Sequence, residues 1–344
     1  MTVERGKRRR GWRDGEVAVR MSAPPLGVDG SNWDSAYHAP VLAREVVDLL
    51  GTCPSVLDGT LGGGGHALAL LEAGVDRVTG LDRDPDALEA VRARLAPFAS
   101  NGRFTAYIGN FAKIDEIVSL ADQRFAGVLL DLGISSHQID DPTRGFTFRE
   151  DAPLDMRMDR GGQAGAYTAA DVLNSFDEHA LAAIFREYGD EHRAHRLARE
   201  IVRRRANRAF VVSDDFVGAI RGAFGPRTGP PDFARLFQAL RIAVNDELTG
   251  LEHALPELRD RLLPGGVMAI IAYHSGEDRL VKHAFRDWSS DCVCPPKQPV
   301  CTCRGRALGE LLGRKATTAA ADELTRNPRA RSARLRAFRR SAET

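Results

Sequence analysis

The chain has 344 residues, of which 43% are hydrophobic and 28% charged; this is the balance of a globular protein and excludes a wholly disordered chain. No apolar run approaches the roughly 18 residues of a transmembrane helix, and the Arg-rich N-terminus lacks the apolar stretch of a signal peptide, so we expect a cytoplasmic protein. The net charge of +1 does not indicate a nucleic-acid partner, although basic residues gather in a few stretches.

The N-terminus is the first of these basic stretches. Residues 1–30 mix charged residues with Gly, Pro and Ser without periodicity, which predicts a disordered basic arm, and Met21 is an alternative start of the protein. The stretch "PVLAREVVDLL" from residue 40 then shows the apolar spacing of a helix.

Short strands and helices alternate over the next part of the chain. Strands are predicted in "SVLDG" (55–59), "RVTGLD" (77–82), "RFTAYIG" (103–109) and "AGVLLDL" (126–132). Helices are predicted from about His66, in "PDALEAVRARLAPF" (85–98) and near 112–122. This alternation is typical of a parallel, doubly wound sheet, so residues 31–135 are expected to form the first part of an α/β core.

The alternation stops after Asp131. Residues 136–235 show helical patterns and no convincing strand, which predicts a helical insertion that recognises the substrate. The α/β pattern resumes in residues 236–344, with a long helical stretch near 234–262, a strand in "PGGVMAIIAYH" and a helix at 277–288. The predicted fold is therefore α/β, a Rossmann-like core with an inserted helical domain.

The glycine-rich stretch "DGTLGGGGHA" (58–67) lies between a predicted strand and a predicted helix, where backbone N–H groups can meet a ligand. It fits the G-x-G-x-x-G pattern of NAD-binding proteins only loosely. Asp58, Asp82 and Asp131 each end a predicted strand, and such strand ends converge on the binding crevice of an open α/β sheet. Carboxylates there would repel a pyrophosphate and attract the cationic S-adenosylmethionine, which indicates a class I methyltransferase core.

Each of these positions suggests a role. Asp82 should accept hydrogen bonds from the ribose hydroxyls, and "GNF" (109–111) should reach the adenine, with Phe111 as an apolar wall. The alternative is that the three aspartates are helix N-caps, for which Asp is also favoured.

Several motifs together resemble the RsmH family, also called MraW: "HAPVLAREVVDLL", "DGTLGGGGHA", "DRDPDAL", "LLDLGISSHQIDDPTRGFTFREDAPLDMRMD", "YHSGEDRLVKHAF" and "NPRARSARLR". The resemblance spans about residues 36–340 and implies methylation of the exocyclic N4 of a cytidine in the decoding centre of bacterial 16S rRNA. That RNA is the expected partner, within the small ribosomal subunit. The resemblance also implies cofactor contacts by Gly64, Gly65, His66, Asp82, Phe111, Asp131 and Gln138.

The chemistry of the acceptor side can be examined separately. Methylation of cytosine C5 needs a thiolate after the fourth strand, and "DLGISS" (131–136) contains no cysteine. The Asp/Asn-Pro-Pro-aromatic motif of another amino-methyltransferase group is also absent there, which leaves the acceptor mechanism open. We expect Asp131, or a backbone carbonyl beside it, to align the amine. His274, Ser275 and His38 are further catalytic candidates, although a lone histidine is more often structural.

The insertion is expected to face the RNA. Arg196, Arg199 and Arg203 are three and four residues apart, on one face of a helix, and Arg157 lies in "DMRMD"; these four are the expected substrate contacts. Solvated helix faces are the alternative. A NAD-dependent oxidoreductase and a non-catalytic RNA-binding assembly factor remain alternative functions, and the oligomeric state is open.

Four of the five cysteines form the pattern C-x-C-x6-C-x-C, at Cys292, Cys294, Cys301 and Cys303. Clustered thiols favour zinc over disulfides in a cytoplasmic protein, but the spacing differs from the usual C-x2-C knuckle. We therefore assign no metal ligand from the sequence and leave a structural zinc site as an alternative. Cys53, before the first strand, is expected to be buried.

Overall fold

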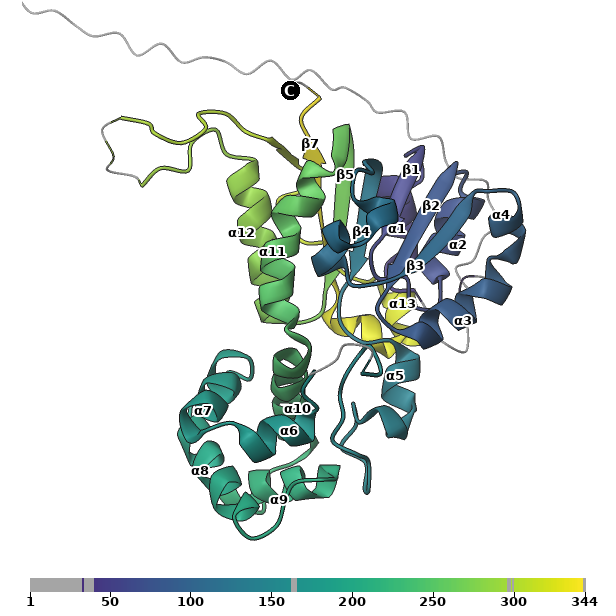
Figure 1. Ribbon diagram of the computed structural model, residues 1–344. Coiled ribbons are helices and arrows are strands. Elements are labelled where there is room, and N and C mark those ends of the chain that lie inside the picture. Colours follow the sequence, from purple (N-terminus) through teal and green to yellow (C-terminus); the bar gives the residue numbers. More distant parts are fainter. Residues whose placement is uncertain (1–32, 34–39, 162–165, 296–297, 299, 343–344) are drawn as a thin grey trace, which may run out of the picture.

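The computed structural model describes Trp33 and residues 40–161, 166–295, 298 and 300–342, and its centre is a seven-stranded sheet (Figure 1). The strand order is β3-β2-β1-β4-β5-β7-β6; the first five strands are parallel, and β7 runs antiparallel to both β5 and β6. The strands are β1 Ser55–Asp58, β2 Arg77–Asp82, β3 Phe104–Ile108, β4 Phe125–Asp131, β5 Leu262–Ala272, β6 Gly309–Leu311 and β7 Arg334–Arg340. This Rossmann-like order confirms the predicted α/β class.

Helices cover both faces of the sheet. Successive residues of the central strand β4 are apolar and point to opposite faces, so each face offers an apolar surface for helices to pack on. Leu129 of β4 packs with the apolar side chains of α1 and α2, whereas Val128 and Leu130 pack with those of α11 and α12. The helices of the core are α1 Ala43–Leu50, α2 Gly65–Glu72, α3 Pro85–Arg94, α4 Ala96–Ser100, α5 Ser136–Asp140, α11 Glu247–Asp260, α12 Ser275–Trp288 and α13 Ala321–Arg326.

The helix expected near 112–122 is wrong. Two short 3₁₀ helices, Phe111–Glu116 and Val118–Leu120, occupy this stretch, with a non-helical residue at Lys113. Only Ile114 and Leu120 are buried there, so the segment lacks the apolar stripe that would hold an α-helix against the sheet.

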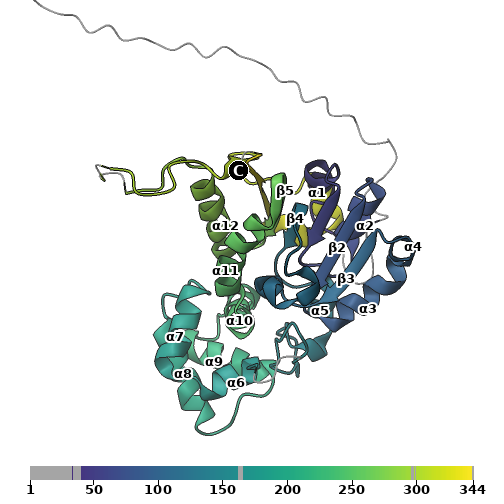
Figure 2. The same ribbon diagram turned by 45° about the horizontal axis from the view of Figure 1, so that its top comes forward.

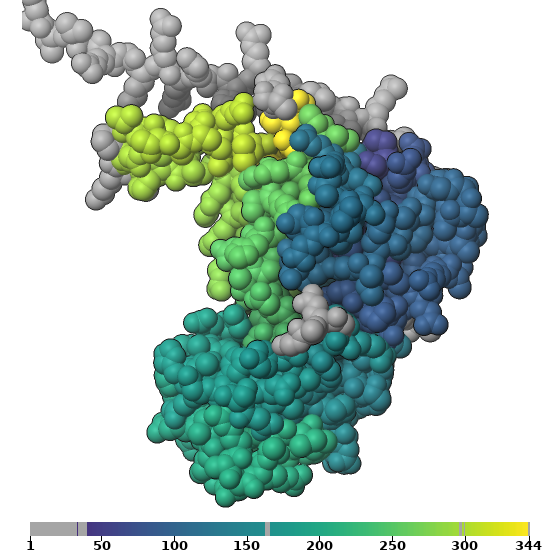
Figure 3. Space-filling model, viewed as in Figure 1, coloured from purple at the N-terminus to yellow at the C-terminus, as the bar shows by residue number. Residues whose placement is uncertain are grey.

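The insertion forms a helical domain with an apolar core of its own, and Figures 1 and 2 both show it beyond the carboxyl ends of the parallel strands. Its helices are α6 Ala169–Ser175, α7 Glu178–Glu187, α8 Ala194–Arg205, α9 Ser213–Phe224 and α10 Pro230–Asn245. Figure 3 shows this domain as a teal lobe beneath the blue and green core.

The predicted boundary at residue 235 falls inside α10. Phe237 and Leu240 of α10 are buried in the core of the helical domain, so this helix packs with the insertion along its length. The long helical stretch expected near 234–262 is present, but as two helices: Asp246 adopts a left-handed conformation (φ 51°) and separates α10 from α11 Glu247–Asp260. Beyond that break, Leu251 and Leu255 pack on the sheet.

The strands β6 and β7 were not predicted. In β7, arginines alternate with the buried residues Leu335 and Ala337, and several of these arginines have specific partners. Arg336 bonds Asp278 at 2.7 Å, and Arg340 donates to the carbonyl oxygens of Asp260 and Leu262. Arg336 and Arg340 therefore hold β7 against α12 and the start of β5. Within the described ranges, no helix has the length and apolar character that crossing a membrane requires.

Candidate active site

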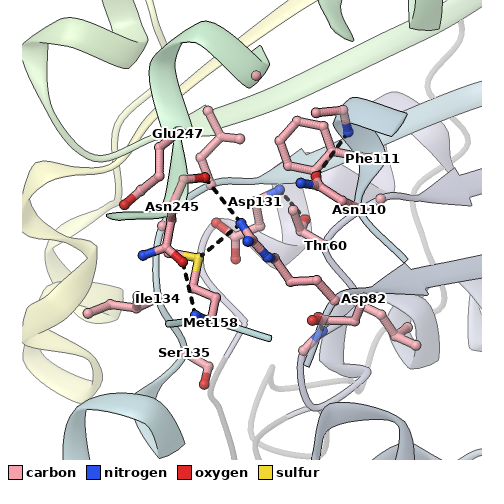
Figure 4. A pocket seen from close by; sticks show the side chains of 18 of the residues that line it. Thr60, Asp82, Asn110, Phe111, Asp131, Ile134, Ser135, Met158, Asn245 and Glu247 are labelled. Atoms are coloured by element: carbon pink, nitrogen blue, oxygen red, sulfur yellow. Dashed lines mark hydrogen bonds between the residues drawn. The ribbon is translucent and has the colours of Figure 1, made fainter. Parts of the chain in front are cut away.

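A cavity opens where the carboxyl ends of the strands meet the helical domain, and it encloses about 1090 Å³ including its mouth (Figure 4). Loops after β1, β2, β3, β4 and β5 line it, together with the junction of α10 and α11. Figure 4 shows Asp82, Asn110 and Phe111 on one side and Asn245 and Glu247 on the other, with Asp131 between them.

The charged residues of the lining are mainly acidic. It includes five carboxylates but one arginine, Arg83, and one histidine, His66; the carboxylates are Asp82, Asp131, Asp246, Glu247 and Glu277. Arg241 neutralises Glu247 through two bonds of 2.7 and 2.8 Å, and His274 lies beside Glu277. The remaining acids make the cavity suited to a cation and unsuited to a pyrophosphate.

Asp82 closes the second strand and faces the cavity. Its Oδ2 accepts a hydrogen bond from the Gly62 backbone at 2.7 Å, and its Oδ1 accepts one from the Asp84 backbone at 2.9 Å. These bonds fix the carboxylate at the glycine loop, and each oxygen keeps a further lone pair for a hydroxyl donor. Burial outweighs the two bonds and raises the pKa of Asp82 to about 6.

The segment after β3 forms a second wall. Gly109, Asn110 and Phe111 line the cavity, and Phe111 also packs against the apolar cluster beneath α11. The Asn110 side chain accepts a bond from the Ala112 backbone at 3.0 Å and so caps the first 3₁₀ helix. The wall is therefore apolar at Phe111 and anchored at Asn110.

The glycine loop contributes only part of its predicted set. Gly65 and His66 line the cavity, whereas Gly64 and Asp58 are not among its lining residues. Gly64 is the N-cap of α2 at φ 71°, and a Cβ there would lie 3.0 Å from Val91, so glycine is required by the turn. Gly65 leaves room for Pro40, 2.9 Å from where a Cβ would stand.

Asp58 is buried behind the loop. Its Oδ1 accepts a bond from the Thr60 backbone at 3.2 Å, while its Oδ2 has no partner among the described residues. Burial, with the nearby charges of Asp131 and Asp82, raises the pKa of Asp58 to about 7. Asp58 was expected to contact the cofactor, but its carboxylate does not line the cavity.

Asp131, at the end of β4, is held by side chains from other elements. The Tyr273 hydroxyl donates to its Oδ1 at 2.8 Å, and its backbone N–H donates to the Thr60 hydroxyl at 2.6 Å. His66 Nδ1 lies 3.8 Å from its Oδ2, while His66 Nε2 donates to the Val41 carbonyl at 2.8 Å. The carboxylate is thus fixed in the cavity from two directions.

Asp58, Asp82 and Asp131 are not helix N-caps. The caps of the adjacent helices are Asp84 for α3 and Ser135 for α5, and Asn110 caps the 3₁₀ helix. The alternative that these three aspartates serve only as N-caps is therefore wrong.

Gln138 lines the cavity and belongs to a buried polar cluster that sequence reasoning missed. Its side chain donates to Asp84 at 2.7 Å, and Arg144 donates to the same carboxylate oxygen at 2.7 Å. Arg144 also donates to the Met158 carbonyl at 2.9 Å, which ties the loop before the helical domain to the start of α3. A charged residue this deeply buried and fully paired could be recognised only from its tertiary partners.

His274 and Ser275 lie outside this cavity. They line a second hollow, between α12 and the helical domain, together with Tyr188, Arg235 and Arg279. His274 caps α12, and its Nε2 lies 3.2 Å from Oε1 of Glu277. Burial alone would raise the pKa of Glu277, but the bonds from His274 and the charge of Arg241 hold it below its usual value. His274 therefore contacts Glu277 and does not line the main cavity. His38 falls outside the described residues.

The four predicted substrate arginines do not come together. Arg157 is bound to Asp155 through bonds of 2.9 and 2.6 Å near the cavity. Arg196, Arg199 and Arg203 do share the exposed face of α8, but Figures 1 and 2 show this helix at the part of the helical domain remote from the sheet. Arg203 bonds Glu200 at 2.7 Å.

Further lining residues were missed because their signal is weak in the sequence. Arg83 lines the cavity, and its Nη1 lies 4.0 Å from the Met158 sulfur and donates to the Asn245 carbonyl at 3.4 Å. The Asn245 side chain accepts a bond from the Met158 backbone N–H at 2.9 Å and donates to the Met156 carbonyl at 2.7 Å. Tyr273 directly follows strand β5, and this position at a strand end was the one feature of the sequence that could have marked it as a site residue.

Comparison with known proteins identifies relatives along nearly the whole chain. The sequence model of the MraW methylase family matches residues 35–341. Ribosomal RNA small subunit methyltransferase H of Gemmatimonas aurantiaca is 61% identical over 315 residues, or 92% of this chain and 99% of that protein. The protein of the same name from Heliobacterium mobile is 45% identical, over 87% of this chain and 97% of its own. A solved structure, the N-methyltransferase NodS of Bradyrhizobium japonicum with S-adenosyl-L-homocysteine, aligns with 87% of this chain and 85% of its own at 8% identity and a TM-score of 0.39, too low to bear on function.

Proposed function

The chain belongs to the MraW methylase family, and from this premise we propose that it methylates the exocyclic N4 amine of a cytidine in the decoding centre of 16S rRNA. The methyl donor of this methylase is S-adenosylmethionine. The names of the relatives, ribosomal RNA small subunit methyltransferases, support an RNA of the small subunit as the substrate. The choice of base, atom and site in the RNA is the part that we propose.

The observation that carries the proposal is the acid-lined cavity at the carboxyl ends of the strands. S-adenosylmethionine presents an ammonium and a sulfonium, which carboxylates attract, and has no phosphate for them to repel. The same lining disfavours the alternative of a NAD-dependent oxidoreductase, because Arg83 is the one arginine or lysine among the lining residues.

For the cofactor we propose contacts that follow the cavity walls. Asp82 would accept bonds from the ribose hydroxyls, Phe111 would pack against the adenine, and Gly65 would let the ligand approach the loop backbone. Gln138 and His66 would complete the pocket. Asp58 would act from behind the loop, through its negative charge alone.

On the acceptor side, we assign the alignment of the amine to Asp131. Its carboxylate is fixed by the Tyr273 hydroxyl at 2.8 Å and faces the cavity, so it can accept a hydrogen bond from an amino group and receive the proton that the amine loses. No cysteine lines the described part of the cavity, and Cys53 lies near the opposite end of β4, bonded to the Ala126 carbonyl. This supports direct transfer to an amine over covalent attack at C5.

The helical domain is the proposed RNA-facing element. Arg196, Arg199 and Arg203 are exposed on α8, so they can contact phosphates at a distance from the target base. The base itself must leave its stack to enter the cavity, since in-line transfer requires access to N4. Arg157, near the cavity, would face the RNA only if it exchanges Asp155 for a phosphate.

Transfer of a radiolabelled methyl group tests the proposal. Purified small subunits and naked 16S rRNA, both from cells that lack this modification, are incubated with the enzyme, and the labelled nucleoside is identified by mass and chromatography. N4-methylated cytidine at one decoding-centre position is the expected product. Label in C5-methylcytidine would contradict the acceptor assignment. Bound cofactor without any transfer to either RNA would instead indicate an RNA-binding assembly factor.

A further inference from the structure

The segment between α12 and β6 has no apolar core of its own. None of its described residues, 289–295, 298 and 300–308, is buried, and Val293 and Val300 are 44% and 68% exposed. Figures 1 and 2 show these residues, called the arm, projecting from the core on the side away from the helical domain. A segment with so little apolar burial needs another interaction to hold one conformation.

Four cysteine sulfurs meet within this arm. The Sγ atom of Cys301 lies 3.7 Å from that of Cys292, 3.9 Å from that of Cys294 and 3.4 Å from that of Cys303. Cys303 and Cys292 are 3.8 Å apart, and all four ligand atoms lie within 4.8 Å of one another. These separations are well above the roughly 2.05 Å of a disulfide bond, so the four residues are thiols.

We propose that these four thiolates bind one structural Zn²⁺ ion. Zinc takes four thiolates tetrahedrally with Zn–S bonds of about 2.3 Å, which places the sulfurs of an ideal site about 3.8 Å apart. The observed distances of 3.4 to 3.9 Å match that tetrahedron. A cluster of two irons would separate its two thiolate pairs further than a single ion does.

Each half of the arm supplies one C-x-C pair, Cys292 with Cys294 and Cys301 with Cys303. Sulfur atoms of the two pairs lie 3.7 to 3.9 Å apart, so both pairs contribute to one site. The Val293 backbone N–H donates to the Sγ of Cys303, and the Thr302 N–H donates to that of Cys294, each at 3.4 Å. Such N–H bonds orient metal-bound thiolates and offset their charge.

The ion would fix the arm to the core. The Arg304 guanidinium donates to the Ser290 carbonyl at 3.1 Å and to that of Asp287, and the Leu308 N–H donates to the Trp288 carbonyl at 2.7 Å. Closing the tip with a metal holds both halves of the arm at these anchors, between the end of α12 and the edge strand β6. The site lies far from the cavity, so its role is structural.

Metal analysis of the full-length protein tests the proposal. After purification under reducing conditions and removal of loose metal, we expect about one zinc ion per chain by mass spectrometry of the elements. The double variant Cys292→Ser/Cys301→Ser should lose this zinc at least about tenfold, since it removes half of the ligands. Cys53→Ser is the matched control and should keep the zinc, because this thiol contacts the core at Ala126. Cobalt in place of zinc should give the absorption of a tetrahedral tetrathiolate site.

Three results would overturn the zinc site. One is a reduced protein that stays metal-free after incubation with zinc; another is iron, or disulfides in freshly isolated protein, in its place; the third is a double variant that retains the zinc. Cofactor affinity and circular dichroism of the double variant show whether it has folded. If the double variant has not folded, the zinc content and the cobalt spectrum of the parent protein still show whether the zinc site exists.

Discussion

The hydroxyl of Tyr273 donates a 2.8 Å hydrogen bond to Oδ1 of Asp131, which joins residues 142 positions apart at the ends of neighbouring strands β5 and β4. Burial first, and the Asp131 charge second, raise the pKa of Tyr273 well above its usual value, so the phenol remains a donor at neutral pH. The strand pairing thereby positions the carboxylate to which we assign the acceptor amine.

Replacing this carboxylate tests the assignment directly. Asp131→Asn should lower turnover by about 100-fold or more at saturating cofactor, because an amide cannot take up the proton of the amine. Turnover and the calorimetric cofactor Kd are measured separately, with the exposed Asp260→Asn as the control that leaves both unchanged. Weak cofactor binding combined with normal turnover at saturation would assign Asp131 to the cofactor alone.

Tyr273→Phe removes only the hydroxyl. Asp131 loses the bond that orients it, so we expect turnover to fall by about tenfold while the cofactor Kd changes by less than about threefold. Single-turnover kinetics with saturating cofactor measure the effect. An equal loss in cofactor affinity would mean that Tyr273 shapes the cofactor site and does not position Asp131.

The cofactor affinity should depend on pH through Asp82. Burial raises the pKa of this carboxyl to about 6, so the protein without cofactor protonates it below that pH and loses an acceptor for the ribose hydroxyls. The affinity of the parent protein should therefore fall as the pH is lowered from 8 to 5. Asp82→Asn should bind about 10- to 100-fold more weakly at pH 8 and lose the part of the pH dependence centred near pH 6, while a contribution from Asp58 near pH 7 remains. An unchanged step near pH 6 in the variant would exclude Asp82 as its source.

Asp58 should destabilise the protein without cofactor at neutral pH. Burial raises its pKa to about 7, so the folded protein holds this proton more tightly than the unfolded chain does, and the free energy of unfolding falls as the pH rises through about 4 to 7. Asp58→Asn should therefore be more stable than the parent at pH 8, on the order of a few kcal/mol, with a clearly smaller gain at pH 5 and little gain below about pH 4. An equal gain at both pH values in urea unfolding would contradict this, and cofactor titration of the same variant tests its electrostatic role.

The α8 arginines should contribute to RNA affinity through phosphates. Changing Arg196, Arg199 and Arg203 to Gln together should weaken binding and make the salt dependence shallower, by about 0.7 to 0.9 in logarithmic slope for each phosphate that the variant no longer neutralises. Filter binding to rRNA over a range of salt concentrations measures the slope, with Arg286→Gln on α12 as the control. An unchanged slope and affinity would remove α8 from the RNA-binding surface.

The sequence by itself determined the order of the elements and the polarity of the strand ends. Alternating apolar patterns predicted strands β1 to β5, and Asp82 and Asp131 at two strand ends marked the crevice, because these features depend on neighbours along the chain. The same pattern could not predict β6 and β7, whose pairing joins residues far apart in sequence.

Only the tertiary structure decided which side chains meet. Asp58 and Asp82 are equivalent in the sequence pattern, yet one lies behind the glycine loop and the other faces the cavity. The bond from Tyr273 to Asp131, the burial of Arg144 against Asp84 and the meeting of four cysteine sulfurs depend on register and packing. Local sequence does not fix these contacts, because a side chain's direction follows from the elements that pack around it.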